Sequence, residues 1–162
     1  MTGRREARRQ ALDILYQADI TDVVATEVLS AWVDAGKSVS SFTQELVEGV
    51  REFQPQIDLL LEEHAEGWTV ARMAVLDRTI LRVAVFELLH SRDVPASVAI
   101  SEAVEAASDL SADESKRFVN GVLGRISREV PGADGASGAA DTIGDAGVGD
   151  VPPARDPASG PV

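Results

Sequence analysis

The chain has 162 residues, with 15 Lys and Arg against 27 Asp and Glu, a net charge of −12 and no cysteine. This length suits about one domain, and the lack of cysteine excludes disulfide frameworks, thiol nucleophiles and cysteine-based zinc sites. The acidic balance argues against a broad nucleic-acid-binding surface, because phosphates need a positive patch. With no apolar run near the roughly 20 residues of a membrane span, and no secretory signal at the arginine-rich start, we expect a soluble, cytoplasmic protein.

Helical periodicity dominates the first half of the chain. Residues 4–20 place small and apolar side chains at spacings of three and four, which predicts an amphipathic helix, and a weaker pattern predicts another over residues 25–35. A third helix is expected to be capped by Ser41 and to run to Phe53. A fourth is expected to begin at Pro55, because proline suits the first turn of a helix.

Residues 75–89 differ from the other segments, because ten of these fifteen residues are apolar and they surround the whole helix. Such a helix is usually central and packed on most sides. Pro95 ends this segment, since the residue before a proline avoids the helical region. Further helices are predicted over residues 97–110 and 113–130. The pattern therefore predicts an all-α bundle of seven helices around one buried helix.

The composition changes sharply at Pro131. Residues 131–162 contain 7 of the 13 glycines, 5 of the 7 prolines and no aromatic residue, and carry a formal charge of −4. Such a segment buries too little apolar surface to offset the backbone entropy lost on ordering, about 1–2 kcal/mol per residue. We therefore expect a folded domain over residues 1–130 and a disordered tail over residues 131–162.

Three sequence motifs carry a family resemblance: RREARRQALDILYQAD at the start, DVPASVAISEAVE after the apolar helix, and FVNGVL beyond it. Together they resemble the NusB family of transcription antitermination factors over residues 1–130. The resemblance implies two three-helix lobes joined along a long helix. It also implies a non-enzymatic role, in which the protein pairs with NusE, a small-subunit ribosomal protein, and binds boxA RNA. On elongating RNA polymerase with other Nus factors, that complex suppresses termination, notably in ribosomal RNA operons.

The first ten residues carry a net charge of +3, from four arginines and one acid: Arg4, Arg5, Arg8, Arg9 and Glu6. At 100° per residue, Arg5 and Arg9 lie on one helical strip with Tyr16. This strip suits single-stranded RNA, because cations hold phosphates and a ring stacks on a base. The alternative is a solvated helix end with Tyr16 at the margin of the core. The resemblance favours RNA binding more for the arginines than for Tyr16.

A second candidate RNA-binding cluster is formed by Lys116, Arg117, Phe118 and Asn120. Phe118 lies off the apolar stripe of its helix, so it either faces RNA or seals the edge of the core. Asn120-Gly121 is unfavourable inside a helix, since glycine costs about 1 kcal/mol relative to alanine. Two explanations are open, and we favour close packing of another helix against Gly121 over RNA contact by the Asn120 amide.

A third set of residues is expected to face a protein, since the resemblance implies a basic, RNA-binding partner and charge complementarity guides docking. In the family, the partner surface draws on the long helix and the segments after it. The expected partner-binding residues are Asp77, Phe86, Glu87, Val98 and Glu114. The alternative for each acid is an ordinary solvated position. By contrast, Arg82 is expected to pack its stem and meet a carboxylate.

An enzymatic function is not supported by the motifs. Glu87-Leu-Leu-His90 has the Glu-x-x-His spacing of di-iron bundles, but such sites need two of these motifs and two further carboxylates. The only other histidine, His64, has Leu61 at the matching position. We therefore expect no enzyme activity, no metal and no other cofactor.

A purely protein-binding helical module is the alternative function, like the NusB-like domain that precedes some RNA cytosine methyltransferases. The chain carries no dinucleotide-type glycine motif and no cysteine nucleophile, which argues against a methyltransferase. The basic N-terminus favours the RNA-binding adaptor. The sequence leaves open whether the protein is a monomer or a homodimer that hides its RNA surface.

Overall fold

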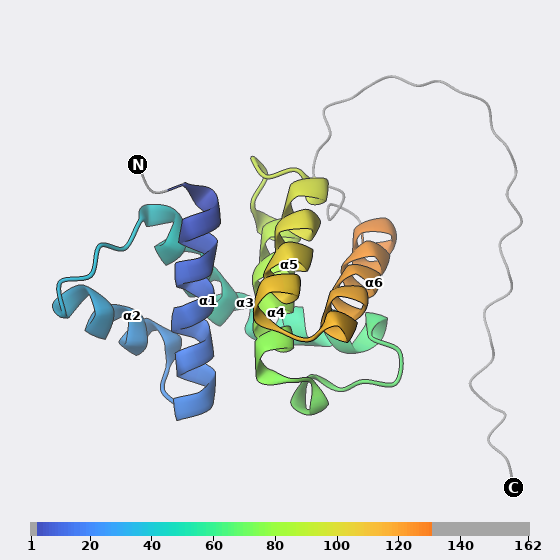
Figure 1. The fold of residues 1–162 in the computed structure, drawn as a ribbon, viewed down its shortest axis with the longest axis horizontal. Coiled ribbons are helices and arrows are strands. Elements are labelled where there is room, and N and C mark those ends of the chain that lie inside the picture. Colours follow the sequence, from blue (N-terminus) through green and yellow to red (C-terminus); the bar gives the residue numbers. More distant parts are fainter. Residues whose placement is uncertain (1–2, 131–162) are drawn as a thin grey trace, which may run out of the picture.

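The computed structural model describes residues 3–130, which form six α-helices and a short 3-10 helix and contain no strand (Figure 1). The elements are α1 (Arg4–Thr21), α2 (Ala25–Asp34), α3 (Ser41–His64), η1 (Val70–Arg72), α4 (Val75–His90), α5 (Ala96–Leu110) and α6 (Asp113–Glu129). The predicted all-α class is therefore confirmed. The expected tail over residues 131–162 lies outside the described residues.

The helices form two groups. Helices α1 and α2 pack against each other and against α3, while α4, α5 and α6 pack together and α6 also contacts α3. Figure 1 shows α3 running from beside the start of α1, behind α4, towards α6. Contacts between α1 and α4 complete the junction. This is the expected arrangement of two lobes joined along a long helix.

Helix α4 is the centre of the molecule, as its apolar composition predicts. It contacts α1, α3, α5 and α6. Its side chains are buried around the helix, and Leu81 and Val85 are fully inaccessible. Helix α3 packs closely on α4 at Gly49, where a Cβ atom would lie 2.2 Å from the ring of Phe86. Glycine at this position allows the two helices to pack together.

The prediction of separate third and fourth helices was wrong. Helix α3 continues through Pro55 for 24 residues. Proline lacks the N–H that a helix interior needs, but Pro55 is exposed, while Val50, Ile57 and Leu61 continue one buried stripe on either side of it. Burial of this continuous stripe holds the helix together across the missing hydrogen bond, which reduces the expected seven helices to six.

The helix cap was also misplaced by one residue. Ser40, not Ser41, is the N-cap of α3, and its hydroxyl accepts a hydrogen bond from the backbone N–H of Thr43 at 3.2 Å. The Thr43 hydroxyl then donates to the carbonyl oxygen of Ala7 at 3.0 Å. The start of α3 is thereby fixed against α1, close to the arginine-rich turn.

Candidate functional site

Three of the four N-terminal arginines point away from the core and meet carboxylates. Arg5 donates through Nε and Nη2 to Glu102 at 3.2 and 3.1 Å, and through Nη2 to Glu105 at 2.8 Å. Arg9 donates to Asp109 at 2.6 Å. These carboxylates all belong to α5. The N-terminal half of α1 is therefore joined to α5 by ion pairs across the surface.

The first arginine of α1 has a different partner. Arg4 bonds Asp93, in the segment between α4 and α5, and its guanidinium also lies 4.9 Å from the ring centre of Phe42. The hydrogen bond from Arg4 lowers the pKa of Asp93 below its ordinary value. In the same way, the hydrogen bond with Glu102 raises the pKa of Arg5. Arg4, Arg5 and Arg9 are thus each paired with at least one carboxylate.

Arg8 faces the interior, contrary to its expected place in the RNA-binding set. Its Nε donates to both oxygens of Glu87 at 2.9 and 3.1 Å, and its Nη2 lies 2.8 Å from Oε1. The two side chains are only 9% and 1% exposed. Burial raises the pKa of Glu87, and the hydrogen bond from Arg8 opposes that rise. Glu87 is therefore the internal counter-ion of Arg8 and is not available to a partner protein.

The sequence contains a signal for this inward position. Arg8 precedes Leu12 and Leu15 by four and seven residues, so all three share one face of α1, and both leucines are buried. Glu87 lies on α4, which is apolar on most sides. A carboxylate buried on such a helix requires a partner, and Arg8 supplies it.

Tyr16 lies on the exposed side of α1 with 39% of its surface accessible, and Ile20 one turn later is 55% exposed. Asp13, also exposed, precedes Tyr16 by three residues on the same helix. Partial desolvation of its carboxyl raises the pKa of Asp13, and the charges of Arg9 and Lys37 oppose that rise. The ring of Tyr16 is thus accessible for stacking. Asp13 lies beside it, an acid that the predicted strip of Arg5, Arg9 and Tyr16 did not take into account.

The second cluster lies on α6. Lys116, Arg117 and Asn120 are exposed, while Phe118 is partly buried against Trp68, with ring centres 6.0 Å apart and the planes tilted by 59°. This pair lines a groove of about 630 Å³ between η1 and the start of α6. Phe118 therefore covers part of the core and also contributes one wall of an open groove.

The packing explanation for Asn120-Gly121 was wrong. A Cβ atom at Gly121 would meet only the guanidinium of Arg125, at 3.9 Å, and no neighbouring helix. Asn120 is exposed and makes no hydrogen bond within residues 3–130. Neither residue is needed for packing in this part of the chain, which leaves the Asn120 amide facing solvent.

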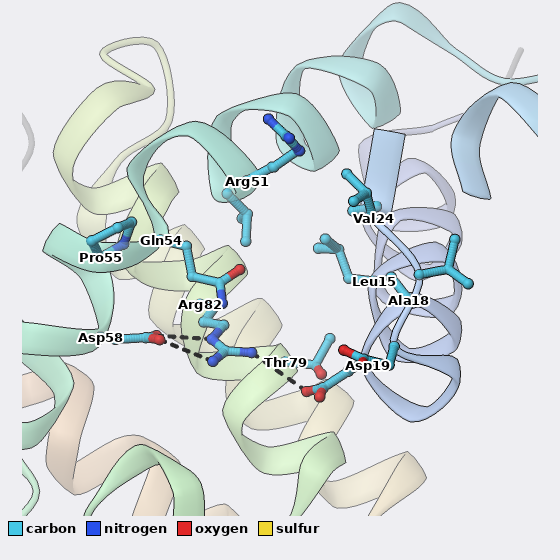
Figure 2. A pocket seen from close by; sticks show the side chains of 14 residues that line it. Leu15, Ala18, Asp19, Val24, Arg51, Gln54, Pro55, Asp58, Thr79 and Arg82 are labelled. Atoms are coloured by element: carbon cyan, nitrogen blue, oxygen red, sulfur yellow. Dashed lines mark hydrogen bonds and ion pairs between the residues drawn. The ribbon is translucent and has the colours of Figure 1, made fainter. Parts of the chain in front are cut away.

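A cleft of about 550 Å³ lies where α1, α3 and α4 meet (Figure 2). Arg82 lies at its base, donating to Asp58 at 2.8 and 3.0 Å and to Asp19 at 3.4 Å. Arg78 donates to both oxygens of Asp19 at 2.6 and 2.7 Å. The expectation that Arg82 meets a carboxylate is confirmed. This network connects three helices, and sequence patterns did not reveal its two acids.

A sequence model described as the NusB family matches residues 5–128. This chain belongs to the NusB family. It is 52% identical to the transcription antitermination protein NusB of Saccharopolyspora erythraea, over 78% of this chain and 87% of the relative. It is 44% identical to the protein of the same name from a Nocardioides species, over 81% of this chain and 98% of the relative.

Solved structures agree with this assignment. The chain is similar to T. maritima NusB, with a TM-score of 0.71 and 32% identity over 79% of this chain and 92% of the other. It is also similar to a chain in the crystal structure of antitermination factors NusB and NusE in complex with dsRNA, with a TM-score of 0.68. That match has 24% identity over 77% of this chain and 96% of the other, and it supports the fold.

The residues expected to face a partner are divided by the fold of this NusB-family chain. Val98 and Glu114 are exposed, the former by 40%. Phe86 is only 4% exposed, because Gly49 packs on its ring. Asp77 is held by the hydroxyls of Ser111 and Ser115, each at 3.0 Å. With Glu87 also internal, the exposed part of this set consists of Val98 and Glu114.

Two further properties concern the described part of the chain. Within residues 3–130, no helix is both long and apolar enough to cross a bilayer. No group of three or more potential metal-binding side chains occurs in the same range. His90, from the Glu-x-x-His motif, instead stacks on Phe53 with ring centres 4.0 Å apart. Glu87 of that motif is bonded to Arg8, so the motif forms two separate contacts.

Proposed function

We propose that this chain is a non-enzymatic antitermination factor that acts in the cytoplasm. It pairs with NusE, and the pair binds boxA RNA of nascent transcripts, notably those of ribosomal RNA operons. Docked on elongating RNA polymerase with other Nus factors, the complex suppresses termination. The family membership of residues 5–128 supports the role. The exposed guanidinium groups on α1 are the observation that supports RNA binding by this chain itself.

The RNA-binding surface in this proposal comprises Arg4, Arg5, Arg9 and Tyr16 on α1, with Lys116, Arg117, Phe118 and Asn120 on α6. Single-stranded RNA is bound by cations, which pair with phosphates, and by aromatic rings, which stack on bases. This surface offers accessible side chains of both kinds. Arg8 is left out, because its guanidinium is enclosed with Glu87. The buried Arg8 instead fixes α1 to α4 and so positions its neighbours.

The partner surface in this proposal is acidic and half-apolar. Glu114 and Val98 are exposed on the α5–α6 side of the molecule, and the exposed ring of Trp68 adds apolar area. A basic ribosomal protein complements this charge. Because the chain carries −12 overall, we expect weak RNA binding by the chain alone and tight binding only with NusE.

The test is fluorescence anisotropy with a labelled boxA RNA and a scrambled RNA of the same length, for the chain alone, NusE alone and both together. We expect tight, sequence-dependent binding only for the pair. The same assay compares Arg5→Ala and Arg9→Ala with Arg51→Ala. Arg51 is the matched control, because it is exposed and has no ion pair within residues 3–130. Equal binding by the chain alone would contradict the cooperative part of the proposal.

A purely protein-binding module is the second candidate. In that case NusE binds, but the pair holds boxA RNA no better than NusE does, and Arg5 and Arg9 variants have no effect. Light scattering of the same samples shows whether the free chain is a monomer or a homodimer, and whether RNA binding accompanies dissociation of the homodimer.

A further inference from the structure

The acids that face the α1 arginines form a row on α5. Glu102, Glu105 and Asp109 are separated by three and four residues, so they share one helical face and lie about 4.5 and 6 Å apart along the axis at 1.5 Å per residue. Arg5 bonds the first two, and Arg9 bonds the third. The acidic row therefore presents a line of anions to the strip that is proposed to bind phosphates.

Carboxylate and phosphate oxygens compete for the same donors. Both accept the paired N–H groups of a guanidinium, and Arg5 already directs Nε and Nη2 at Glu102. A phosphate that binds Arg5 through the paired Nε and Nη2 donors must therefore replace a carboxylate. When RNA binds, a phosphate thus takes the place of a carboxylate on the guanidinium. It does not bind to an unpaired guanidinium.

These ion pairs are open enough to exchange. The side chains of Arg5 and Arg9 are 61% and 32% exposed, and Glu105 and Asp109 are 44% and 54% exposed. Exposed pairs are weak and are screened by salt. The side chain of Glu102 is more enclosed, at 19%, so it has less room to move than the side chain of Arg5.

We propose that the acidic row of α5 is an internal competitor of RNA, which holds the arginines of α1 until phosphates displace its carboxylates. This inference rests on the proposed RNA-binding function and adds a regulatory feature to it. The acidic row lowers the affinity for any polyanion. Only an RNA that makes further contacts, elsewhere on the protein or on its partner, then binds stably.

The first experiment neutralises the acidic row. Glu102→Gln with Glu105→Gln is combined with NusE, and boxA RNA binding is followed by fluorescence anisotropy. We expect binding about three- to tenfold tighter than wild type, in line with the free energy of two exposed ion pairs. Thermal melting of the variant shows that it is folded, and Asp109→Asn tests the same idea independently through Arg9.

The matched control changes the net charge equally elsewhere. Glu27→Gln with Asp34→Asn removes two exposed acids of α2, which form no ion pair within residues 3–130. Helix α2 lies on the side of α1 away from α5 (Figure 1). If the control tightens RNA binding as much as the Glu102 and Glu105 variant, the effect is only that of net charge and the competitor is excluded.

A salt series and a double-mutant cycle sharpen the result. A freed Arg5 that gains a phosphate releases counter-ions, so the salt dependence of binding should steepen by up to about one unit in the variant. Arg5→Ala should also weaken binding more in the variant than in wild type, because its competing carboxylates are gone.

The outcomes separate this inference from the proposed function. If wild type with NusE does not bind boxA RNA, the proposed function fails. If wild type binds but the Glu102 and Glu105 variant binds equally or more weakly, the carboxylates orient the arginines for RNA and the competitor is refuted, while the function stands.

Discussion

Arginines on two sides of α1 form ion pairs of the same chemistry in different surroundings. Arg8 and Glu87 are enclosed between α1 and α4, with 9% and 1% of their side chains exposed. Arg5 and Glu102 join α1 to α5 at the surface, where Arg5 is 61% exposed. A buried charge depends on its partner, whereas an exposed charge has water as an alternative. Burial therefore separates an arginine that holds the fold from one that is free to bind a ligand.

The largest effect is expected from breaking the buried pair. Arg8→Met leaves the Glu87 carboxylate buried without its partner and should lower the free energy of unfolding by about 3–5 kcal/mol. The double variant Arg8→Met with Glu87→Leu should recover most of this loss, because no uncompensated charge remains. Urea denaturation measures all three proteins. If Arg8→Met is as stable as wild type, the buried pair contributes no more to stability than the exposed pairs, and the comparison fails.

An intermediate effect is expected at the cleft between the lobes. Arg82→Ala removes the partner of Asp58 and the packing of a side chain that is 13% exposed, so it should cost about 1–3 kcal/mol of stability. The affinity of the complex with NusE for boxA RNA should change by less than about twofold. Thermal melts and anisotropy on the same preparation test both parts. A large loss of RNA affinity with an unchanged melting temperature would place Arg82 with the surface arginines.

A smaller and pH-dependent effect is expected at Asp19. Hydrogen bonds from Arg78 hold the pKa of this carboxyl below its ordinary value of 3.8. Such a group stabilises the fold above its unfolded pKa, and this contribution is lost as the pH falls through the lower folded pKa. Asp19→Asn should therefore cost about 1 kcal/mol at pH 7, and its difference from wild type should narrow below about pH 4. Urea denaturation across pH 3–7 measures this, and a constant difference would contradict the assignment.

The smallest effect on stability is expected from the outer arginines. Arg5→Ala and Arg9→Ala should leave the melting temperature nearly unchanged, because exposed ion pairs contribute little. Each should weaken boxA binding in the presence of NusE by about two- to fivefold and flatten its salt dependence, since each removes one cation. Anisotropy over a salt series measures this. If the salt dependence is unaltered in the double variant Arg5→Ala with Arg9→Ala, these arginines do not bind RNA and the cluster is an ordinary solvated helix end.

The amino-acid sequence by itself determined the helical class, the central place of α4 and the family. Each depends on patterns within one segment: apolar spacing of three and four residues, an apolar helix without a polar face, and motifs such as FVNGVL. Such local patterns follow from the geometry of a single helix. They also located the basic N-terminal turn and placed Tyr16 on one strip with Arg5 and Arg9, because composition and angular position need no tertiary contacts.

Only the tertiary structure decided which of the candidate residues are accessible. Arg8 meets a carboxylate 79 residues away, and Arg5 meets two that are 97 and 100 residues away. The continuity of α3 through Pro55 likewise depends on burial of its stripe against other helices. Helical periodicity gives the direction of a side chain around its own axis. The packing of one helix on another decides whether that direction leads to solvent, to the core or to an opposite charge.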